Sequence, residues 1–242
     1  SNHEKGLEIY KELAAEDPKN VLLQQGLAIA MVNTGESKSK LHRIADGGRD
    51  ITQGIGIMNK ILTKDPNSQE RGILAQMHMT LADHFARSNR PSQGAREYGN
   101  AIQIFERMNR DSNNSGIAPI IATCRVRRGN LEMRAGNYPA AEADFQQVLD
   151  ATVSEVQKKN PDAIRDRARA YAGLGDLESA RASRSGSGER KAHWRMAEQW
   201  YQSSLEVGKQ LPPTAQAGRD AFSAVEVGGR YQKARSGLPT NR

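Results

Sequence analysis

Apolar residues recur with a helical period along most of this chain. Between residues 69 and 88 they follow one another at steps of three and four: Leu74, Met77, Leu81 and Phe85. That spacing places them on one face of an amphipathic α-helix. Comparable stretches continue toward the C-terminus, so the pattern predicts an all-α protein.

Glycine, proline and polar residues separate the predicted helices. The breaks fall at Gly47-Gly48, Asp65-Pro66, Asn89-Arg90-Pro91, Ser185-Gly186-Ser187-Gly188 and Pro212-Pro213. Proline cannot continue a helix, and it pushes the residue before it out of the helical region. After a helix already under way at the N-terminus, we expect helices at about 21–45, 51–64, 69–88, 92–110, 117–135, 139–159, 163–184, 189–210 and 214–234.

One of these breaks recurs at a fixed interval. Asp17-Pro18 recurs as Asp65-Pro66 and as Asn160-Pro161. Pro66 follows Pro18 by 48 residues, and Pro161 follows Pro66 by 95 residues, close to twice that interval. The turn expected midway between the last two falls at Asn113-Asn114-Ser115-Gly116. Such a period marks stacked copies of one supersecondary unit. We therefore predict one domain over 1–242, a right-handed superhelical stack of antiparallel helix pairs. Its parts are a half unit at 3–20, units of about 47 residues at 21–66, 67–114, 115–161 and 162–212, and a capping helix at 213–236.

A small residue four positions before an aromatic residue marks the second helix of most units. The pairs are Gly6 and Tyr10, Gly94 and Tyr98, Ala141 and Phe145, and Ala197 and Tyr201. The small residue lets two helices approach closely, and we expect the ring to fill the gap between neighbouring pairs. No copy can bury its apolar face alone, so stacking must form the core.

The composition limits the chemistry that the chain can support. No run of about 18 apolar residues occurs, so we expect no membrane insertion by this chain. Cys124 is the only cysteine, which excludes an internal disulfide and a thiolate zinc site, and we expect it to be buried. His78 and His84 are six residues apart and do not share a helix face. We expect no metal, no cofactor and no catalytic residue.

The net charge of +7 favours an acidic partner. The excess is concentrated from Glu106 to Arg134, a segment with six arginines and three acidic residues. Nucleic acid is the alternative ligand, and RNA binding by a helical repeat is the alternative function. The small number of aromatic residues and the lack of a code repeated in each unit argue against RNA.

The segment from Arg134 to Phe145, Arg-Ala-Gly-Asn-Tyr-Pro-Ala-Ala-Glu-Ala-Asp-Phe, resembles the centre of a tetratricopeptide repeat. Gly129 and the segment 174–180 resemble other parts of the same motif. The family's unit has about 34 residues, so this chain resembles a variant with longer helices. The resemblance implies an α-solenoid that holds peptide segments on the face formed by its first helices.

The segment from Ala192 to Leu205 is similar to the closing repeat of tetratricopeptide regions in bacterial serine/threonine protein kinases. This implies the non-catalytic tail of such an enzyme, a scaffold or sensing module. We expect a cytoplasmic location, or an extracytoplasmic one if the parent kinase is anchored in a membrane. Ser1-Asn2 indicates a cloning remnant, so we expect a piece of a longer protein.

The candidate peptide-binding residues lie on the first helices, away from most of the apolar positions. They are Gln76, Asp83 and Arg87 in one unit, and Thr123, Arg127, Asn130 and Arg134 in the next. Two arginines flanking Asn130 suit a carboxylate through charge-assisted hydrogen bonds, and ordinary solvated arginines are the alternative. A homodimer through the N-terminal half unit is a further hypothesis, because its apolar side lacks a covering helix.

Overall fold

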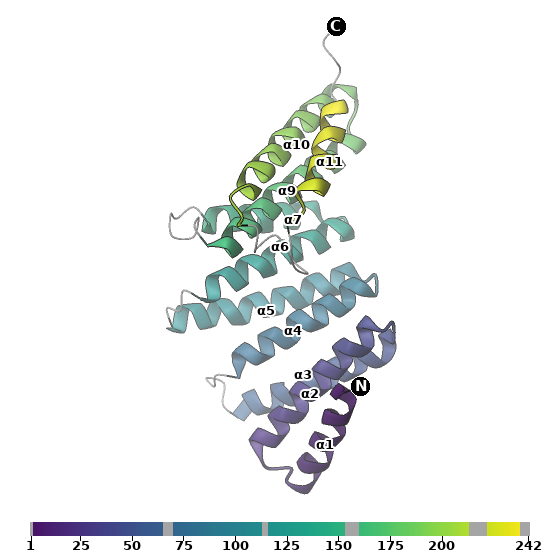
Figure 1. Ribbon diagram of the computed structural model, residues 1–242, viewed down its shortest axis with the longest axis vertical. Coiled ribbons are helices and arrows are strands. Elements are labelled where there is room, and N and C mark those ends of the chain that lie inside the picture. The colour runs from purple at the N-terminus through teal and green to yellow at the C-terminus, as the bar shows by residue number, and fades with distance from the viewer. Residues whose placement is uncertain (1, 65–69, 113–115, 153–159, 213–221, 238–242) are drawn as a thin grey trace. The chain divides into compact units, whose positions relative to one another are not determined.

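The computed structural model describes residues 2–64, 70–112, 116–152, 160–212 and 222–237 (Figure 1). These parts are helical and contain no strand, which confirms the all-α class and the pairing of consecutive helices. The helices are α1 (Asn2–Glu16), α2 (Val21–Lys40), α3 (Ile44–Lys64), α4 (Arg71–Arg87), α5 (Pro91–Ser112), α6 (Ile117–Ala135), α7 (Tyr138–Ala151), α9 (Pro161–Arg184), α10 (Ser187–Gly208) and α11 (Ala224–Ser236).

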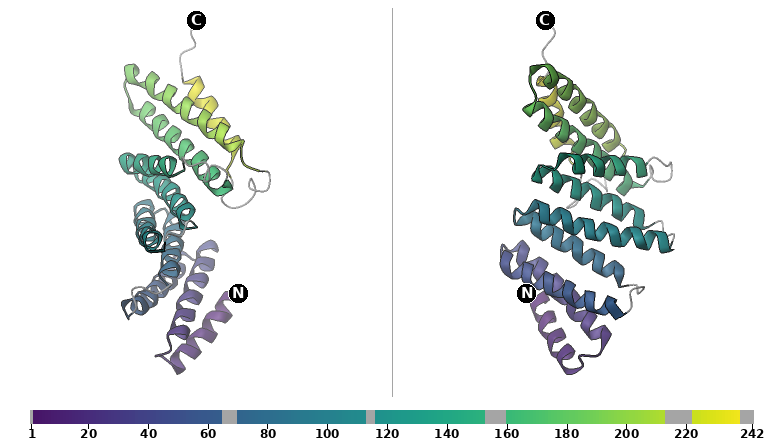
Figure 2. Two further views of the ribbon diagram at one scale, coloured as in Figure 1. Left: turned by 90° about the vertical axis from the view of Figure 1, so that its left-hand side faces the viewer. Right: turned by 180° about the vertical axis from the view of Figure 1, so that it is seen from behind.

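The chain forms two compact units, which we call unit 1 (residues 1–124) and unit 2 (residues 125–242). In unit 1, α2 packs against α3 and α4 against α5, and α3 joins the two pairs by packing against α4. In unit 2, α9 packs against both α7 and α10, and α10 packs against α11. Figure 2 shows the α2–α3 and α4–α5 pairs as antiparallel hairpins.

The break predicted at Gly47-Gly48 is wrong. The chain reverses earlier, at Leu41-His42-Arg43, where His42 takes a left-handed conformation with φ 62°. Both glycines lie inside α3. Neighbouring groups approach the helix so closely at these two positions that there is no room for a side chain. A Cβ at Gly47 would stand 2.6 Å from the carbonyl oxygen of Gly35 on α2.

Two of the recurring turns lie in the described residues, and each supplies a helix N-cap. The Asn20 side chain accepts from the backbone N–H groups of Leu22 and Leu23 at the start of α2. Asn160 accepts from the N–H of Asp162, with Pro161 in the first turn of α9. An N-cap carbonyl satisfies backbone donors that a helix start leaves without partners. The predicted turns at 65–68 and 113–115 lie outside the described residues, as do 153–159 and 213–221 of the predicted helices.

Aromatic rings of one helix pack on glycines of a neighbouring helix in unit 2. Phe145 of α7 is fully buried between Gly129 of α6 and Gly173 of α9. Tyr201 of α10 covers Gly175 of α9 in the same way. In unit 1, Tyr10 of α1 lies on Gly26 of α2. The small-and-aromatic pattern therefore has a second half, a glycine on the helix that the ring covers.

Candidate functional site

The described residues of unit 2 include a polar pocket of roughly 340 Å³. Its lining comes mainly from three helices: Val126, Arg127 and Asn130 from α6, Arg169, Ala172, Gly173 and Asp176 from α9, and Glu226, Val227 and Arg230 from α11, with Phe222 just before α11. The volume is in the range of small-ligand sites, and it is large enough for one or two side chains of a bound segment.

Asp176 ties the walls of this pocket together. Its carboxylate accepts from the Tyr201 hydroxyl at 2.8 Å and from Arg230 Nη1 of α11, also at 2.8 Å. Burial raises the pKa of Asp176 above its ordinary value, although Arg230 and the Tyr201 hydroxyl act in the opposite direction. Asp176 therefore serves first to hold α11 against α9.

The pocket has a cationic lining on balance. Arg127, Arg169 and Arg230 outnumber Asp176 and Glu226, and Asp176 is already engaged by Arg230. Arg169 lies 3.7 Å from the buried carboxylate of Asp166 on its own helix. Guanidinium groups at the rim of a partly enclosed pocket bind carboxylates more strongly than the same groups in open solvent.

The structure brings two of the predicted residues together in this pocket and leaves a third outside it. Arg127 and Asn130 both line the pocket, as neighbours on one face of α6. Arg134, two turns beyond Arg127, is exposed and does not contribute to the lining. Thr123 belongs to unit 1 and is partly buried.

Gln76 lies in a different and mainly apolar groove in unit 1, of roughly 550 Å³. Its lining comes from Ile29, Val32 and Asn33 of α2, Gly72, Ile73, Gln76, Met77 and Thr80 of α4, Phe105 and Met108 of α5, and Ile117 and Ile120 of α6. Asn33, Gln76 and Thr80 are its polar members, and no charged side chain of the described residues lines it. The groove suits apolar side chains next to a hydrogen-bonding backbone.

Asp83 and Arg87 lie on the same face of α4 as Gln76, but their side chains are directed toward buried parts of the protein. The Asp83 carboxylate accepts from the hydroxyl of Tyr98, which is buried on α5. The Arg87 side chain is partly buried, and both of its terminal nitrogens are shielded from solvent. Neither residue lines the unit 1 groove.

Our sequence reasoning missed Arg169, Glu226 and Arg230. The repeat itself offered a signal for Arg169. Asn130 follows Asp83 by 47 residues, and Asp176 follows Asn130 by 46 residues, so the three occupy equivalent positions in successive units. Applying the same interval to the next unit leads to Asp176 on α9, and Arg169 lies two helical turns before it on the same face. No register predicts Arg230, because it belongs to the predicted capping helix, which lies outside the repeating units.

The histidines and Trp200 form internal contacts. His78 Nδ1 lies 2.8 Å from Glu97, and His84 Nδ1 lies 2.8 Å from Ser39. Burial acts to raise the pKa of Glu97, but the hydrogen bond and charge of His78, together with Asn100, hold it below its ordinary value. Trp200 stacks on Tyr171. Within the described parts of the chain, no three metal-ligating side chains gather in one place.

The predictions for Cys124, for membrane insertion and for a homodimer can each be compared with the structure. Cys124 is buried, as predicted. No helix among the described residues is both long and apolar enough to cross a bilayer. Ile9 and Leu13 of α1 and Leu22 of α2 are exposed, and the homodimer through this surface stays a prediction.

Comparison with known proteins gives similarity at the level of fold. No protein-family model matches the chain, and no curated protein matches it in sequence. The crystal structure of BtubC (BKLC) from P. vanneervenii matches with a TM-score of 0.61 and 15% identity, covering 98% of this chain and 85% of that chain. The C-terminal part of a TPR repeat-containing protein from Cytophaga hutchinsonii aligns with 14% identity and a TM-score of 0.28, covering 99% of this chain and 95% of that one. The BtubC similarity indicates a shared all-α arrangement of helix pairs.

Proposed function

We propose that this chain is a non-catalytic protein-interaction module of the tetratricopeptide-like type. In this proposal, the pocket of unit 2 receives an acidic side chain or a terminal carboxylate of a bound peptide segment. The observation that supports it is the convergence of Arg127, Asn130, Arg169 and Arg230 from three helices on one pocket. The apolar groove of unit 1 offers a further surface for the same class of ligand.

The arrangement favours a carboxylate for a physical reason. A carboxylate has two acceptor oxygens, which match the paired N–H donors of a guanidinium group, and the NH2 group of the Asn130 amide can add a further donor. The Asp176 carboxylate accepts from Arg230 Nη1 at 2.8 Å and so orients the Arg230 side chain. Less conformational entropy is then lost when a ligand binds to that side chain.

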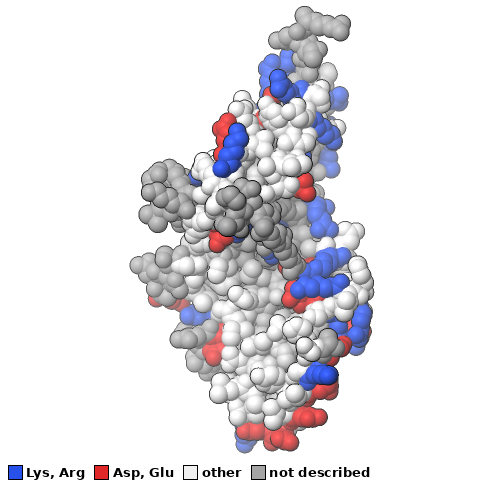
Figure 3. Space-filling view, viewed as in Figure 1, with Lys and Arg blue, Asp and Glu red and all other residues white. Residues whose placement is uncertain are grey.

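The nucleic-acid alternative lacks a supporting observation in the described residues. Several arginines of unit 2 are held in ion pairs, such as Arg128 with the buried Asp144 and Arg181 with Glu142 and Glu178. Figure 3 shows acidic and basic side chains interspersed on the visible face, without an unbroken basic surface. The kinase-tail resemblance stays a prediction, and none of the comparisons supports it.

Arg127 offers a direct test of this proposal, with Arg134 on the same helix as its matched control. The probe is a short fluorescein-labelled peptide rich in glutamate, compared with the same peptide carrying glutamine instead. Because a hydrogen bond between charged groups contributes about 1.5–3 kcal/mol, Arg127→Gln should weaken binding about tenfold or more. Arg134→Gln should leave the affinity unchanged, and fluorescence anisotropy at low ionic strength measures both.

Thermal melting of both variants separates loss of binding from loss of folding. Equal affinity for the glutamate and glutamine peptides would contradict the carboxylate pocket. Equal loss in the Arg127 and Arg134 variants would mean that general charge, and not the pocket, attracts the peptide.

A further inference from the structure

A second pocket of unit 1 lies between α3 and α4, away from the groove that contains Gln76. It has a volume of roughly 440 Å³. Its polar and charged lining includes Arg49 and Thr52 of α3, His84 of α4, and Arg90, which follows α4. Apolar side chains such as Phe85 form the rest, so the pocket combines an apolar wall with hydrogen-bonding groups, as small-molecule sites do.

His84 is the central group of this pocket, and its hydrogen bonds determine its tautomer. The Ser39 hydroxyl donates its proton to the carbonyl of Gly35 at 2.8 Å. The contact of 2.8 Å between Ser39 Oγ and His84 Nδ1 must therefore have Nδ1–H as its donor. Burial, with added repulsion from Arg87 and Arg90, lowers the pKa of His84. The ring is then neutral at pH 7, and Nε2 carries a lone pair.

Gly48 leaves space beside His84 Nε2, and both residues line the pocket. A Cβ at Gly48 would stand 2.7 Å from Nε2, so any side chain at this position would press on that atom. His84 is only 3% exposed, and its Nδ1 is engaged by Ser39, which leaves Nε2 as the ring nitrogen that a ligand can reach. A neutral imidazole nitrogen with a lone pair accepts a hydrogen bond, and an O–H group of a ligand in the pocket can supply the donor.

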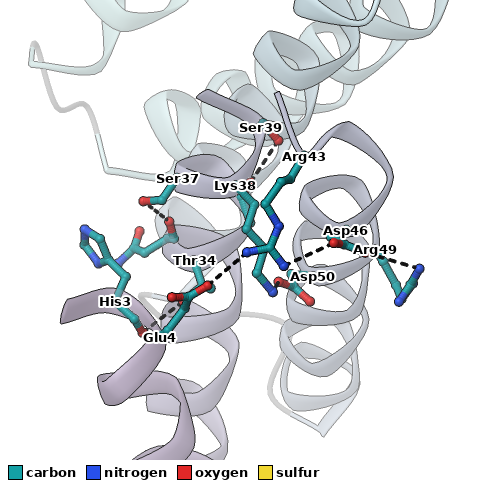
Figure 4. Close-up of polar contacts among 12 residues, drawn as sticks. His3, Glu4, Thr34, Ser37, Lys38, Ser39, Arg43, Asp46, Arg49 and Asp50 are labelled. Carbon is teal, nitrogen blue, oxygen red and sulfur yellow. Dashed lines mark hydrogen bonds and ion pairs between the residues drawn. The ribbon is translucent and has the colours of Figure 1, made fainter. Parts of the chain in front are cut away.

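The pocket is also positively charged. Arg49 and Arg90 line it, and none of the described residues in its lining carries a carboxylate. The acidic groups of α3 have basic partners outside this pocket: Asp50 pairs with Lys38 of α2 at 2.6 Å, and Asp46 pairs with Arg43 at 3.2 Å (Figure 4). Asp46 also lies 3.6 Å from Arg49, a longer contact. Arg90 lies over the Phe85 ring at 4.8 Å, which places its charge beside the apolar wall.

We propose that this pocket binds a small organic oxyanion that retains one O–H group, on an apolar body. The anionic oxygens accept from Arg49 and Arg90, the O–H donates to His84 Nε2, and the apolar body lies against Phe85. A phosphate monoester in its singly protonated form, which predominates below its second pKa of about 6, and an α-hydroxy carboxylate share this chemistry. A plain carboxylate lacks the donor, and a neutral alcohol lacks the charge.

Four probes test the proposal on the whole chain: phenyl phosphate, mandelate, phenylacetate and the neutral mandelamide. Binding is followed by NMR through the His84 ring nitrogens. We expect phenyl phosphate, mandelate or both to shift the Nε2 resonance saturably. Phenylacetate should bind about tenfold more weakly because it lacks the donor, and mandelamide should not bind measurably. The tighter of the first two probes distinguishes a phosphate ligand from a hydroxy acid.

Two variants and one control complete the test. Arg90→Gln should weaken the tighter probe about tenfold or more, and Gly48→Ala should abolish the Nε2 shift by filling the space beside the ring. Lys40→Gln removes a charge of unit 1 that does not line the pocket and that pairs with Glu36 of its own helix, and should leave the affinity unchanged. Far-UV circular dichroism checks folding. If no probe shifts Nε2, or if Arg90→Gln binds as the parent chain does, the proposal fails. The same holds if inorganic phosphate binds as tightly as phenyl phosphate, since the site would then hold an adventitious ion only.

Discussion

Several buried polar side chains of this protein find partners on another helix. Asp144 is 2% exposed, and its carboxylate accepts two hydrogen bonds from the guanidinium group of Arg128 of α6. Glu178 pairs with His193 of α10 and with Arg181 on its own helix. Such groups cost free energy when they lose a partner, so they determine how the helices align as well as how tightly they pack.

His84 should make the stability of the chain depend on pH. Its pKa in the folded chain lies below the unfolded value near 6.5, so below that pH the unfolded chain binds a proton that the folded chain excludes. Stability is therefore complete above about pH 6.5 and decreases as the pH falls toward the folded pKa. Urea unfolding at about pH 5 and about pH 8 should show a smaller difference for His84→Gln than for the parent chain. His3→Gln, at an exposed position, is the control, and an unchanged difference in His84→Gln would refute this role.

At the scale of elements, contacts between rings and glycines determine the spacing of helices. Phe145 fills the space between α6 and α9 only because Gly129 and Gly173 carry no side chain. Glycine in a helix interior ordinarily costs about 0.5–1 kcal/mol relative to alanine. The packing of a fully buried ring offsets that cost, since burying a large apolar side chain contributes about 1.5–3 kcal/mol.

Substitution of Gly173 should therefore reverse the usual effect of replacing a helical glycine. A Cβ there would meet Phe145 Cε2 at 2.6 Å, so Gly173→Ala should destabilise the chain by about 1–3 kcal/mol through overpacking. Gly229→Ala in α11 meets nothing within 4 Å and should stabilise by up to about 1 kcal/mol. Urea unfolding measures both variants. A Gly173→Ala variant as stable as the parent would show that the ring moves aside without loss.

At the scale of the whole molecule, the chain consists of two compact units built from helix pairs. In helical-repeat proteins each pair contacts its neighbours, so stability is close to a sum of local terms. A defect in one place is then expected to act mainly on the adjacent helices.

Hydrogen exchange of the Gly173→Ala variant tests this locality. We expect faster amide exchange in α7 and α9 of unit 2, while α2 and α3 of unit 1 keep the protection of the parent chain. Mass spectrometry of peptic peptides resolves these helices. Equal acceleration in all four helices would indicate one cooperative unit and contradict the additive description.

Part of the candidate site was visible in the sequence, and the limit has a physical cause. Arg127 and Asn130 stand three residues apart on a predicted helix, so their shared face follows from helical geometry alone. Arg134 satisfied the same periodicity, yet it extends past the pocket. Periodicity gives direction around a helix axis, and it does not give the point along the axis where a neighbouring helix ends the site.

The amino-acid sequence by itself determined the all-α class, the order of the helices and the pairing of neighbours, because these depend on local periodicity and on short connections. Only the tertiary structure decided the rest. It placed Gly47 and Gly48 inside α3, where the close approach of α2 and His84 requires glycine. It also brought Arg169 and Arg230 to Arg127, because packing joins side chains of α6, α9 and α11 that are far apart in the chain.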